Sequence, residues 1–322
     1  MDNKIKTIDV MKAFKFLSKT AFVFSLVLLA SCSSDNDIEE TNEAKTIAKK
    51  LEFKANTDLS DLIDESDVTR ATLEENYSVS WDKDDKILVY CDNSDQAVDF
   101  AITPSSVEGS TATFTNYGEV LPLWFDPDQF YFALYPYSSG ATFDPQDDMI
   151  TSSLPTEQSV SVGRTYDKKA LFMTACADMD ERIFNFLNIP ALVKINIKNN
   201  GDGKVKFIEI VSKNSANSLS GNFKASSGYG YKGKMPALKF NAVSGADKKH
   251  TVRLQIPASA ESQDFYIAVL PCTINGFTLK LEGDRYSEIY SRVSSKDSRL
   301  KSSKVYDFGS YDIESLTTPE VK

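Results

Sequence analysis

The sequence predicts an all-β protein built from antiparallel β-sandwiches. After Arg70, short segments in which apolar and polar residues alternate recur along the chain, and Gly, Pro, Asn and Asp separate them. No window of about a dozen residues in this part shows the 3.6-residue periodicity of an amphipathic helix. Many short alternating strands with turn residues between them are typical of a β-sandwich.

In the first half of the chain, a polar and acidic stretch comes before the strand-rich part. A short helix is expected over Lys45–Leu51, and an Asp-rich turn over Asp82–Asp85. Strands are expected at Leu51–Ala55, Tyr77–Trp81, Lys86–Tyr90, Thr111–Phe114 and Phe130–Tyr135.

The second half has clearer alternation. In Leu192–Lys198, Val193, Ile195 and Ile197 fall on one face and their polar neighbours on the other. The turn Asn199–Gly203 follows this strand. Further strands are expected at Val205–Ile210, Val252–Ile256 and Phe277–Leu281.

An internal similarity indicates two related halves. Phe130–Pro136 and Phe265–Pro271, 135 residues apart, share the pattern Phe-Tyr-x-Ala-x-x-Pro. Continuous apolar runs of this length suit strands buried on both faces, with proline at the end of the strand. The alternative is a coincidental match. We expect two sandwiches in tandem, and the predicted segments are a signal peptide (1–31), an acidic tether or pro-segment (32–70), and sandwiches at 71–182 and 183–322.

The amino-terminal leader predicts export and lipidation. Five lysines precede the apolar run Ala21–Ala30, which is about half the roughly 20 residues that a membrane-spanning helix needs. The run ends in Leu29-Ala30-Ser31-Cys32, which resembles the bacterial lipobox, and the Cys32 thiol would carry the diacylglycerol. The alternative is an ordinary signal peptide with an incidental cysteine. The acidic stretch Ser33–Glu40 resembles a surface-export signal of Bacteroidales lipoproteins, and it would serve equally as a solvated tether.

Charge and cysteine content exclude several classes of protein. The net charge is −10, and it becomes −13 without residues 1–31, which hold five lysines and two acidic residues. Nucleic acid is therefore not an expected partner, because its binding needs a basic surface. Beyond Cys32, only Cys91, Cys176 and Cys272 remain, so a scaffold stapled by many disulfides is excluded.

No enzyme active site, metal site or cofactor is predicted. The only histidine, His250, stands in a polar turn among lysines and is expected to be exposed, so neither a Ser-His-Asp triad nor a zinc site is indicated. The acidic residues of Asp82–Asp85 and Asp147–Asp148 are expected to be solvated turn residues and not a catalytic pair. Trp81 and Trp124 could stack on sugars, but core packing is the more frequent role of such aromatic residues.

The order of these features resembles the fimbrillin-like family of Bacteroidales, the lipoprotein precursors of type V pili. The resemblance covers most of residues 70–310. Its matching stretches are Trp81–Ile87, Tyr131–Tyr137, Leu171–Met173, Ala191–Ile195 and Phe265–Pro271. It implies two β-sandwiches of transthyretin-like or Greek-key type, no catalysis, and a place in a fimbrium at the outer-membrane surface.

The resemblance also implies a maturation site at Val68-Thr69-Arg70-Ala71. An Arg-specific extracellular protease would cut after Arg70, and the alternative is an ordinary arginine at a domain edge. Loss of the segment before Ala71 would uncover a groove for a strand of another pilin subunit. This chain's own donor strand would use Tyr311, Ile313 and Leu316 as anchors, whereas a short or absent donor would suit a tip or accessory subunit.

Two functions follow as hypotheses. In the first, the chain is a pilus subunit or pilus-associated adhesin, whose partners are other pilin subunits, the protease and a host or bacterial surface ligand. In the second, it is a glycan-binding lipoprotein that stays in the outer membrane through the lipid on Cys32.

Overall fold

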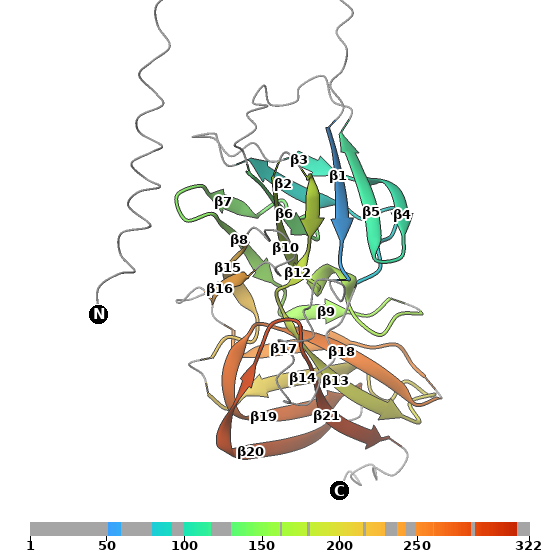
Figure 1. The fold of residues 1–322 in the computed structure, drawn as a ribbon. Coiled ribbons are helices and arrows are strands. Elements are labelled where there is room, and N and C mark those ends of the chain that lie inside the picture. The colour runs from blue at the N-terminus through green and yellow to red at the C-terminus, as the bar shows by residue number, and fades with distance from the viewer. Residues whose placement is uncertain are drawn as a thin grey trace, which may run out of the picture. The chain divides into compact units, whose positions relative to one another are not determined.

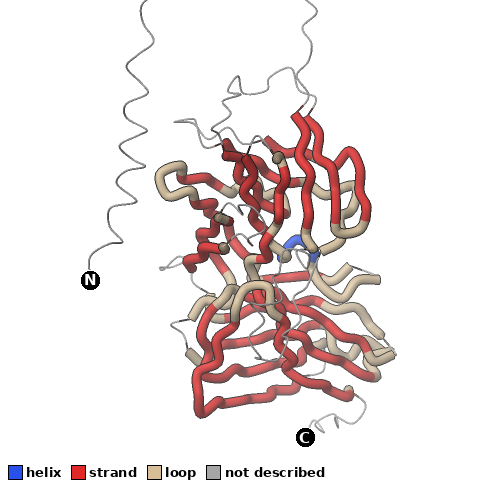
Figure 2. The backbone as a smooth tube through the Cα atoms, in the orientation of Figure 1, coloured by secondary structure: helices blue, strands red, loops and turns tan. Residues whose placement is uncertain are grey.

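β-Strands make up nearly all of the regular structure, and the one helical element that Figure 2 shows in blue is the 3₁₀ turn Lys168–Ala170. The computed structural model describes residues 51–58, 79–91, 100–116, 130–161, 163–178, 181–214, 217–228, 237–242, 249–259, 261–284 and 287–313. The predicted all-β sandwich fold is confirmed. Most strand pairs are antiparallel, and three pairs, β1 with β11, β13 with β21 and β17 with β9, are parallel.

Three sheets stack around a first hydrophobic cluster (Figure 1). The first sheet has the order β11-β1-β5-β4: Ile183–Asn185, Leu51–Asn56, Thr111–Asn116 and Pro104–Glu108. The second has the order β12-β10-β6-β2-β3: Leu187–Asn188, Met173–Asp178, Phe130–Tyr135, Ile87–Cys91 and Phe100–Ile102. The third has the order β16-β15-β8-β7: Leu238–Ala242, Gly221–Ser227, Met149–Leu154 and Thr142–Asp144.

The second sheet forms the middle layer of this stack. Tyr131 of β6 contacts Phe53 of the first sheet, with ring centroids 5.2 Å apart. The next residue, Phe132, contacts Phe143 of the third sheet at 5.0 Å. Successive side chains of a strand point to opposite faces, so β6 is buried on both sides. This burial explains the continuous apolar run at Phe130–Tyr135.

Two further sheets enclose a second hydrophobic cluster. One has the order β18-β13-β21: Gln263–Val269, Ala191–Lys198 and Val305–Asp312. The other has the order β20-β19-β14-β17-β9: Ser287–Leu300, Cys272–Glu282, Phe207–Ser212, Thr251–Gln255 and Glu157–Ser159.

Strand β18 faces both hydrophobic clusters. Ile267 and Val269 belong to the second cluster, whereas Ala268 and Leu270 belong to the first. The repeated sequence pattern at Phe130–Pro136 and Phe265–Pro271 therefore marks two strands that are each buried on both faces. In both places an apolar side chain is needed at consecutive positions because both faces are covered.

One predicted strand is wrong in its described part. Val79 and Trp81 are buried, as the alternation predicts, but Val79–Trp81 forms no strand. The Trp81 backbone N–H donates to the carbonyl of Gly109 at 2.9 Å, and the Val79 carbonyl accepts from the Thr57 side chain. A loop and a side chain thus satisfy the backbone groups that a neighbouring strand would otherwise pair.

Strand pairing crosses the predicted domain boundary near residue 182. β8 pairs with β15, and β9 pairs with β17, so Met149–Ser159 contributes to sheets formed largely by later strands. Phe223 and Ala225 lie in the first cluster, and Val160 lies in the second. All described residues belong to one compact unit, Ala48–Lys322. The tandem division at residue 182 stays a prediction.

Candidate strand-exchange interface

Strand β1 lies inside the first sheet, with a neighbour on each side (Figure 1). It pairs antiparallel with β5 over its whole length, from Leu51 opposite Asn116 to Asn56 opposite Thr111. On its other side, Lys54–Asn56 pairs in parallel with Ile183–Asn185 of β11. A strand that precedes Arg70 in the sequence therefore holds an interior position in the sheet.

The side chains of β1 alternate between the core and the surface. Phe53 and Ala55 are 0 % and 1 % exposed, whereas Lys54 between them is exposed. The Phe53 ring stacks on Phe184 of β11, with centroids 4.6 Å apart. Burial of a phenylalanine side chain stabilises a protein by roughly 1.5–3 kcal/mol, so Phe53 contributes much of the free energy that holds β1 in the sheet.

Thr57 fastens the end of β1 to the loops beside it. Its hydroxyl donates to the carbonyl of Val79 at 2.6 Å, and its backbone N–H donates to the carbonyl of Ser110 at 3.0 Å. The Phe186 N–H donates to the Asn56 carbonyl at 2.8 Å. Removal of β1 with Thr57 would break these hydrogen bonds.

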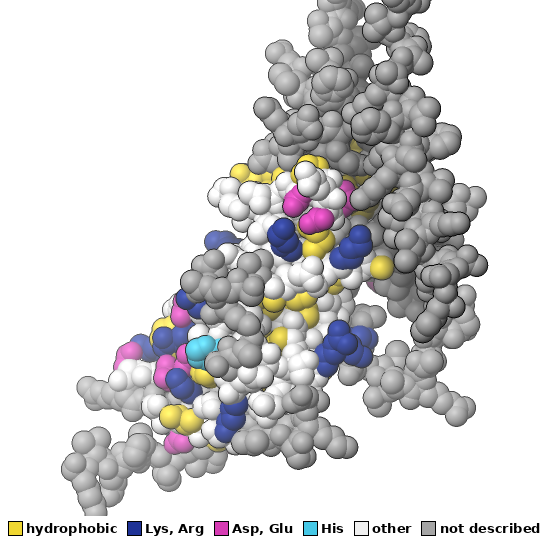
Figure 3. Space-filling view, turned by 90° about the vertical axis from the view of Figure 1, so that its left-hand side faces the viewer, with side chains coloured by type: hydrophobic (Ala, Val, Ile, Leu, Met, Phe, Trp, Pro, Cys, Tyr) yellow, Lys and Arg dark blue, Asp and Glu magenta, His cyan; other side chains and the backbone are white. Residues whose placement is uncertain are grey.

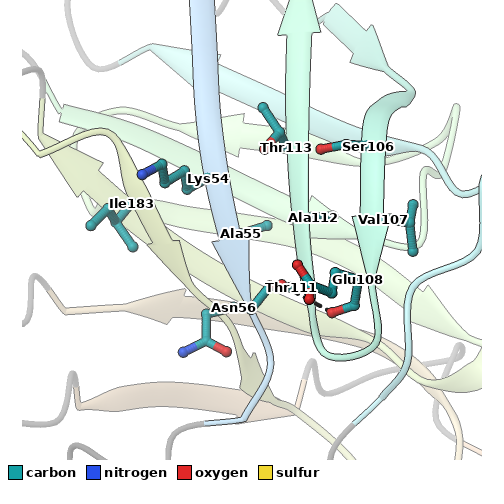
Figure 4. A pocket seen from close by; sticks show the side chains of 10 residues that line it. All are labelled: Lys54, Ala55, Asn56, Ser106, Val107, Glu108, Thr111, Ala112, Thr113 and Ile183. Carbon is teal, nitrogen blue, oxygen red and sulfur yellow. Dashed lines mark hydrogen bonds between the residues drawn. The ribbon is translucent and has the colours of Figure 1, made fainter.

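The outer face of this sheet carries a surface cavity of about 440 Å³ (Figure 4). Lys54 and Asn56 of β1 lie beside Thr113 and Thr111 of β5 there. Ser106, Val107 and Glu108 of β4 and Ile183 of β11 complete the lining with Ala55 and Ala112. The lining contains no aromatic ring that could stack on a sugar. Because β1 provides part of the wall, removal of β1 would alter the shape of the cavity.

Most of the predicted site residues lie outside the described residues. This holds for the lipidation site Cys32, the cleavage site Arg70 and Ala71, and the donor anchor Leu316. Their roles stay predictions. The two remaining donor anchors, Tyr311 and Ile313, are described.

Tyr311 and Ile313 pack into the chain's own second cluster. Ile313 is 0 % exposed, and its N–H donates to the Lys198 carbonyl at 3.0 Å. The Tyr311 ring lies against Tyr290 of β20, with centroids 4.7 Å apart. Ile313 is therefore not accessible to another subunit in this structure, whereas Tyr311 is partly buried. A donor role for either residue stays a prediction.

The turn before β2 holds an ion cluster that the sequence analysis missed. Asp85, which was expected to be solvated, is 9 % exposed, whereas Asp82 is half-buried and Asp84 is exposed. Lys168 Nζ donates to Asp82 at 2.6 Å and to Asp85 at 2.7 Å. Arg164 donates to Asp82 at 2.5 Å.

Local hydrogen bonds hold Asp85 and Lys168 in this arrangement. The Tyr135 hydroxyl donates to Asp85 Oδ1 at 3.0 Å, and the Asp82 N–H donates to Asp85 Oδ2 at 2.7 Å. Asp167 caps the 3₁₀ turn that carries Lys168, accepting from the Lys169 N–H at 2.9 Å. A sequence signal existed in the Asp-x-x-Asp spacing, but its basic partners lie about 80 residues later in the chain.

The charges of the cluster influence one another. Hydrogen bonding to Lys168 and Arg164 holds the pKa of Asp82 below its usual value, although partial burial opposes the shift. Burial, assisted by the neighbouring Asp85 carboxylate, raises the pKa of Tyr135, so its hydroxyl stays protonated and can donate. The Asp82 carboxylate therefore remains ionised beside Lys168 and Arg164 at neutral pH.

The described residues provide little for catalysis. They contain no group of three or more His, Cys, Asp or Glu side chains placed to hold a metal ion. His250 is exposed, and Figure 3 shows this histidine among intermingled acidic and basic side chains. Burial raises the pKa of the Cys272 thiol to about 12, which keeps it protonated and a poor nucleophile. Trp81 is a core residue at 3 % exposure, as expected.

In the part of the chain that the structure describes, no helix is both long and apolar enough to cross a bilayer. The sequence matches no protein-family model and no curated protein.

A comparison with solved structures found partial matches. One is described as a candidate cell adhesion protein from Bacteroides ovatus, with 16 % identity and a TM-score of 0.47 over 85 % of this chain and 96 % of that chain. Another, of the same description, comes from Bacteroides uniformis, with 15 % identity and a TM-score of 0.44 over 82 % and 95 %. A fimbrial assembly protein from Parabacteroides distasonis shows 9 % identity and a TM-score of 0.32 over 81 % and 90 %. Scores of this size do not establish a shared fold.

Proposed function

We propose that this chain is a pilus subunit or pilus-associated adhesin that accepts a strand of another subunit once β1 has been removed. The observation that carries the proposal is the position of β1, an interior strand that precedes Arg70. The solved structures named above are described as cell adhesion and fimbrial proteins, which is the same class of function, but the proposal does not depend on them.

Removal of β1 would leave a site of defined chemistry. The inner edges of β5 and β11 would each lose a hydrogen-bonding partner, and the volume of Phe53 and Ala55 would be left empty. Unpaired backbone groups and a wet apolar groove are both unfavourable, and an added strand satisfies both. The free energy of strand addition is then what drives assembly.

The groove specifies which strand it accepts. A matching donor needs a large apolar side chain at the Phe53 position, a small one at Ala55 and a hydroxyl at Thr57. Between these positions it needs polar residues, because Lys54 and Asn56 face the outer surface. Other pilin subunits are the proposed donors.

In this proposal, cleavage after Arg70 converts an anchored precursor into an acceptor. The lipid on Cys32 holds the precursor at the outer-membrane surface, and two or more acyl chains suffice for stable anchoring. An extracellular Arg-specific protease then separates residues 1–70 from the rest, and the mature chain enters the fimbrium.

The test is the amino terminus of the protein at the cell surface. Intact-mass measurement and amino-terminal sequencing are expected to give a chain that begins at Ala71. A surface protein that still begins at lipidated Cys32 would contradict the proposal and favour the anchored glycan-binding lipoprotein. An Arg70→Ala variant is the matched control, and it is expected to keep its lipidated terminus.

A further inference from the structure

The backbone and indole N–H groups of Trp81 bind the carbonyls of Gly109 and Ser110, and two further sets of contacts hold the segment Val79–Asp85. The first set comes from β1, through the bond from the Thr57 hydroxyl to the Val79 carbonyl. The second set is the ion cluster, in which Arg164 and Lys168 bind Asp82 and Asp85. Only the first set would be lost with β1.

The segment carries a residue that the core depends on. The Trp81 ring makes edge contacts with Phe114, Tyr135 and Phe186, with ring centroids 5.1–5.4 Å apart. Its indole N–H donates to the Ser110 carbonyl at 3.1 Å. Trp81 therefore closes the same core that β1 covers, close to the place where β1 ends.

The basic side of the cluster belongs to a firmly anchored part of the molecule. The Tyr266 N–H of β18 donates to the Thr165 carbonyl at 2.8 Å, and Tyr166 forms a bridge to Tyr266. The Ser159 N–H donates to Asp167 at 2.9 Å. Arg164 and Lys168 thus extend from a segment that is bound to strands other than β1.

The ion pairs are partly shielded from water. The side chains of Lys168 and Asp85 are 14 % and 10 % exposed, and two acidic and two basic residues leave the cluster without net charge. Breaking one partner of a shielded pair costs more than breaking a surface pair, since the other charge stays behind unpaired.

We propose that Asp82, Asp85, Arg164 and Lys168 form an ionic clamp that positions Val79–Asp85 independently of β1, so that Trp81 stays in the core and the groove keeps its shape during strand exchange. The purpose of the clamp rests on the proposed function. The physical statement, that ion pairs hold this segment without any contact to β1, does not rest on the proposed function.

The test is hydrogen exchange, followed by mass spectrometry, on the uncut full-length chain. Lys168→Met is expected to speed exchange in Val79–Asp85 by about tenfold or more relative to wild type, because Asp85 is shielded whereas Asp82 is half exposed. Lys168→Arg is expected to restore slow exchange. Lys169→Met and Asp84→Asn are matched controls, because both side chains are exposed, and they are expected to leave exchange unchanged.

A second variant distinguishes the contribution of the clamp to exchange protection from that of β1. Thr57→Val removes the bond from Thr57 to Val79, and in the double variant Thr57→Val/Lys168→Met the two increases in exchange rate are expected to multiply, as for independent contacts. Asp85→Asn, which keeps the shape of the side chain, serves the same test if Lys168→Met does not fold.

Two results would contradict the proposed ionic clamp. One is equal exchange in Lys168→Met and Lys169→Met. The other is faster exchange in every strand alike, which would indicate a general loss of stability. Neither result depends on whether Arg70 is cut, so the clamp and the proposed function can fail separately.

Discussion

Phe53 illustrates at the residue scale why β1 is held firmly in the uncut chain. The side chain is fully buried between Phe184 and Tyr131, and it is the largest side chain that β1 places in the core. The side chain of its neighbour Lys54 is exposed.

Phe53→Ala is expected to lower the free energy of unfolding by about 3–5 kcal/mol, because truncation of a buried phenylalanine leaves a cavity. Urea denaturation measures the change. Lys54→Ala is the control, and it is expected to stay within about 0.5 kcal/mol of wild type. An equal effect of both substitutions would show that β1 is not packed as described.

Asp82 gives the ion cluster a defined pH dependence. Its pKa is lowered from 3.8 in the folded chain, mainly by hydrogen bonding to Lys168. A lowered carboxylate pKa adds stability above the unfolded value, and this stability is lost as the pH falls through the folded pKa.

Wild type is therefore expected to exceed Asp82→Asn in stability at neutral pH, by no more than about 1 kcal/mol, since Asp82 is half exposed. The difference is expected to stay constant down to about pH 5 and to shrink below the usual carboxylate pKa. Urea midpoints across this range measure it. A difference that grows on acidification would contradict the assigned ion pairs.

Individual residues show what the sequence could and could not predict. Alternation correctly placed Val193, Ile195 and Ile197 on a buried face. It did not reveal that Asp85 is buried, because its burial depends on Lys168 and Tyr135, which are 83 and 50 residues away in the chain. Contacts of such separation leave no local pattern in one sequence.

At the scale of elements, the strands themselves were predictable but their partners were not. The segments Lys86–Tyr90, Thr111–Phe114 and Phe130–Tyr135 lie in or largely overlap β2, β5 and β6. The parallel neighbours β1 and β11 are more than 120 residues apart. Local alternation determines which face of a strand is buried, whereas packing of the whole chain determines which strand lies beside it.

Strand β21 closes the second cluster of its own chain. Phe308 stacks on Phe277 with centroids 4.0 Å apart, and Ile313 just beyond the strand is fully buried. Lys194 of β13 forms an ion pair with Asp307 at 2.9 Å, which holds the pKa of Asp307 below its usual value. The strand is thus attached by packing, pairing and charge.

Ile313→Ala is expected to lower the stability of the isolated chain by about 2–5 kcal/mol, because the side chain fills its own core. Ile289, which is 61 % exposed, provides a control of the same residue type. Ile289→Ala is expected to have little effect in the same urea titration. A neutral Ile313→Ala would indicate that this residue is instead free for another subunit.

At the scale of the whole molecule, strand pairing links the parts of the chain before and after residue 182. The sheet β18-β13-β21 contributes side chains to both hydrophobic clusters, and β8 and β9 pair across the boundary expected at residue 182. Composition and periodicity predicted the class of fold, but a boundary based on one repeated pattern could not reveal pairings between early and late strands.

The division of the core into two hydrophobic clusters would allow one strand to be exchanged while the rest of the chain stays folded. The buried side chains that the structure describes in β1, Phe53 and Ala55, belong to the first cluster, and the second cluster consists of residues from Val160 onward. Loss of β1 is therefore expected to open one groove and to leave the second cluster intact.

The most direct test of strand exchange is light scattering on the purified chain before and after cutting with an Arg-specific protease, with Arg70→Ala treated in parallel. If strand exchange occurs, the cut chain is expected to release the fragment that contains β1 and to self-associate, whereas Arg70→Ala keeps the fragment and stays monomeric. A cut chain that retains the fragment and remains monomeric, like Arg70→Ala, would contradict it.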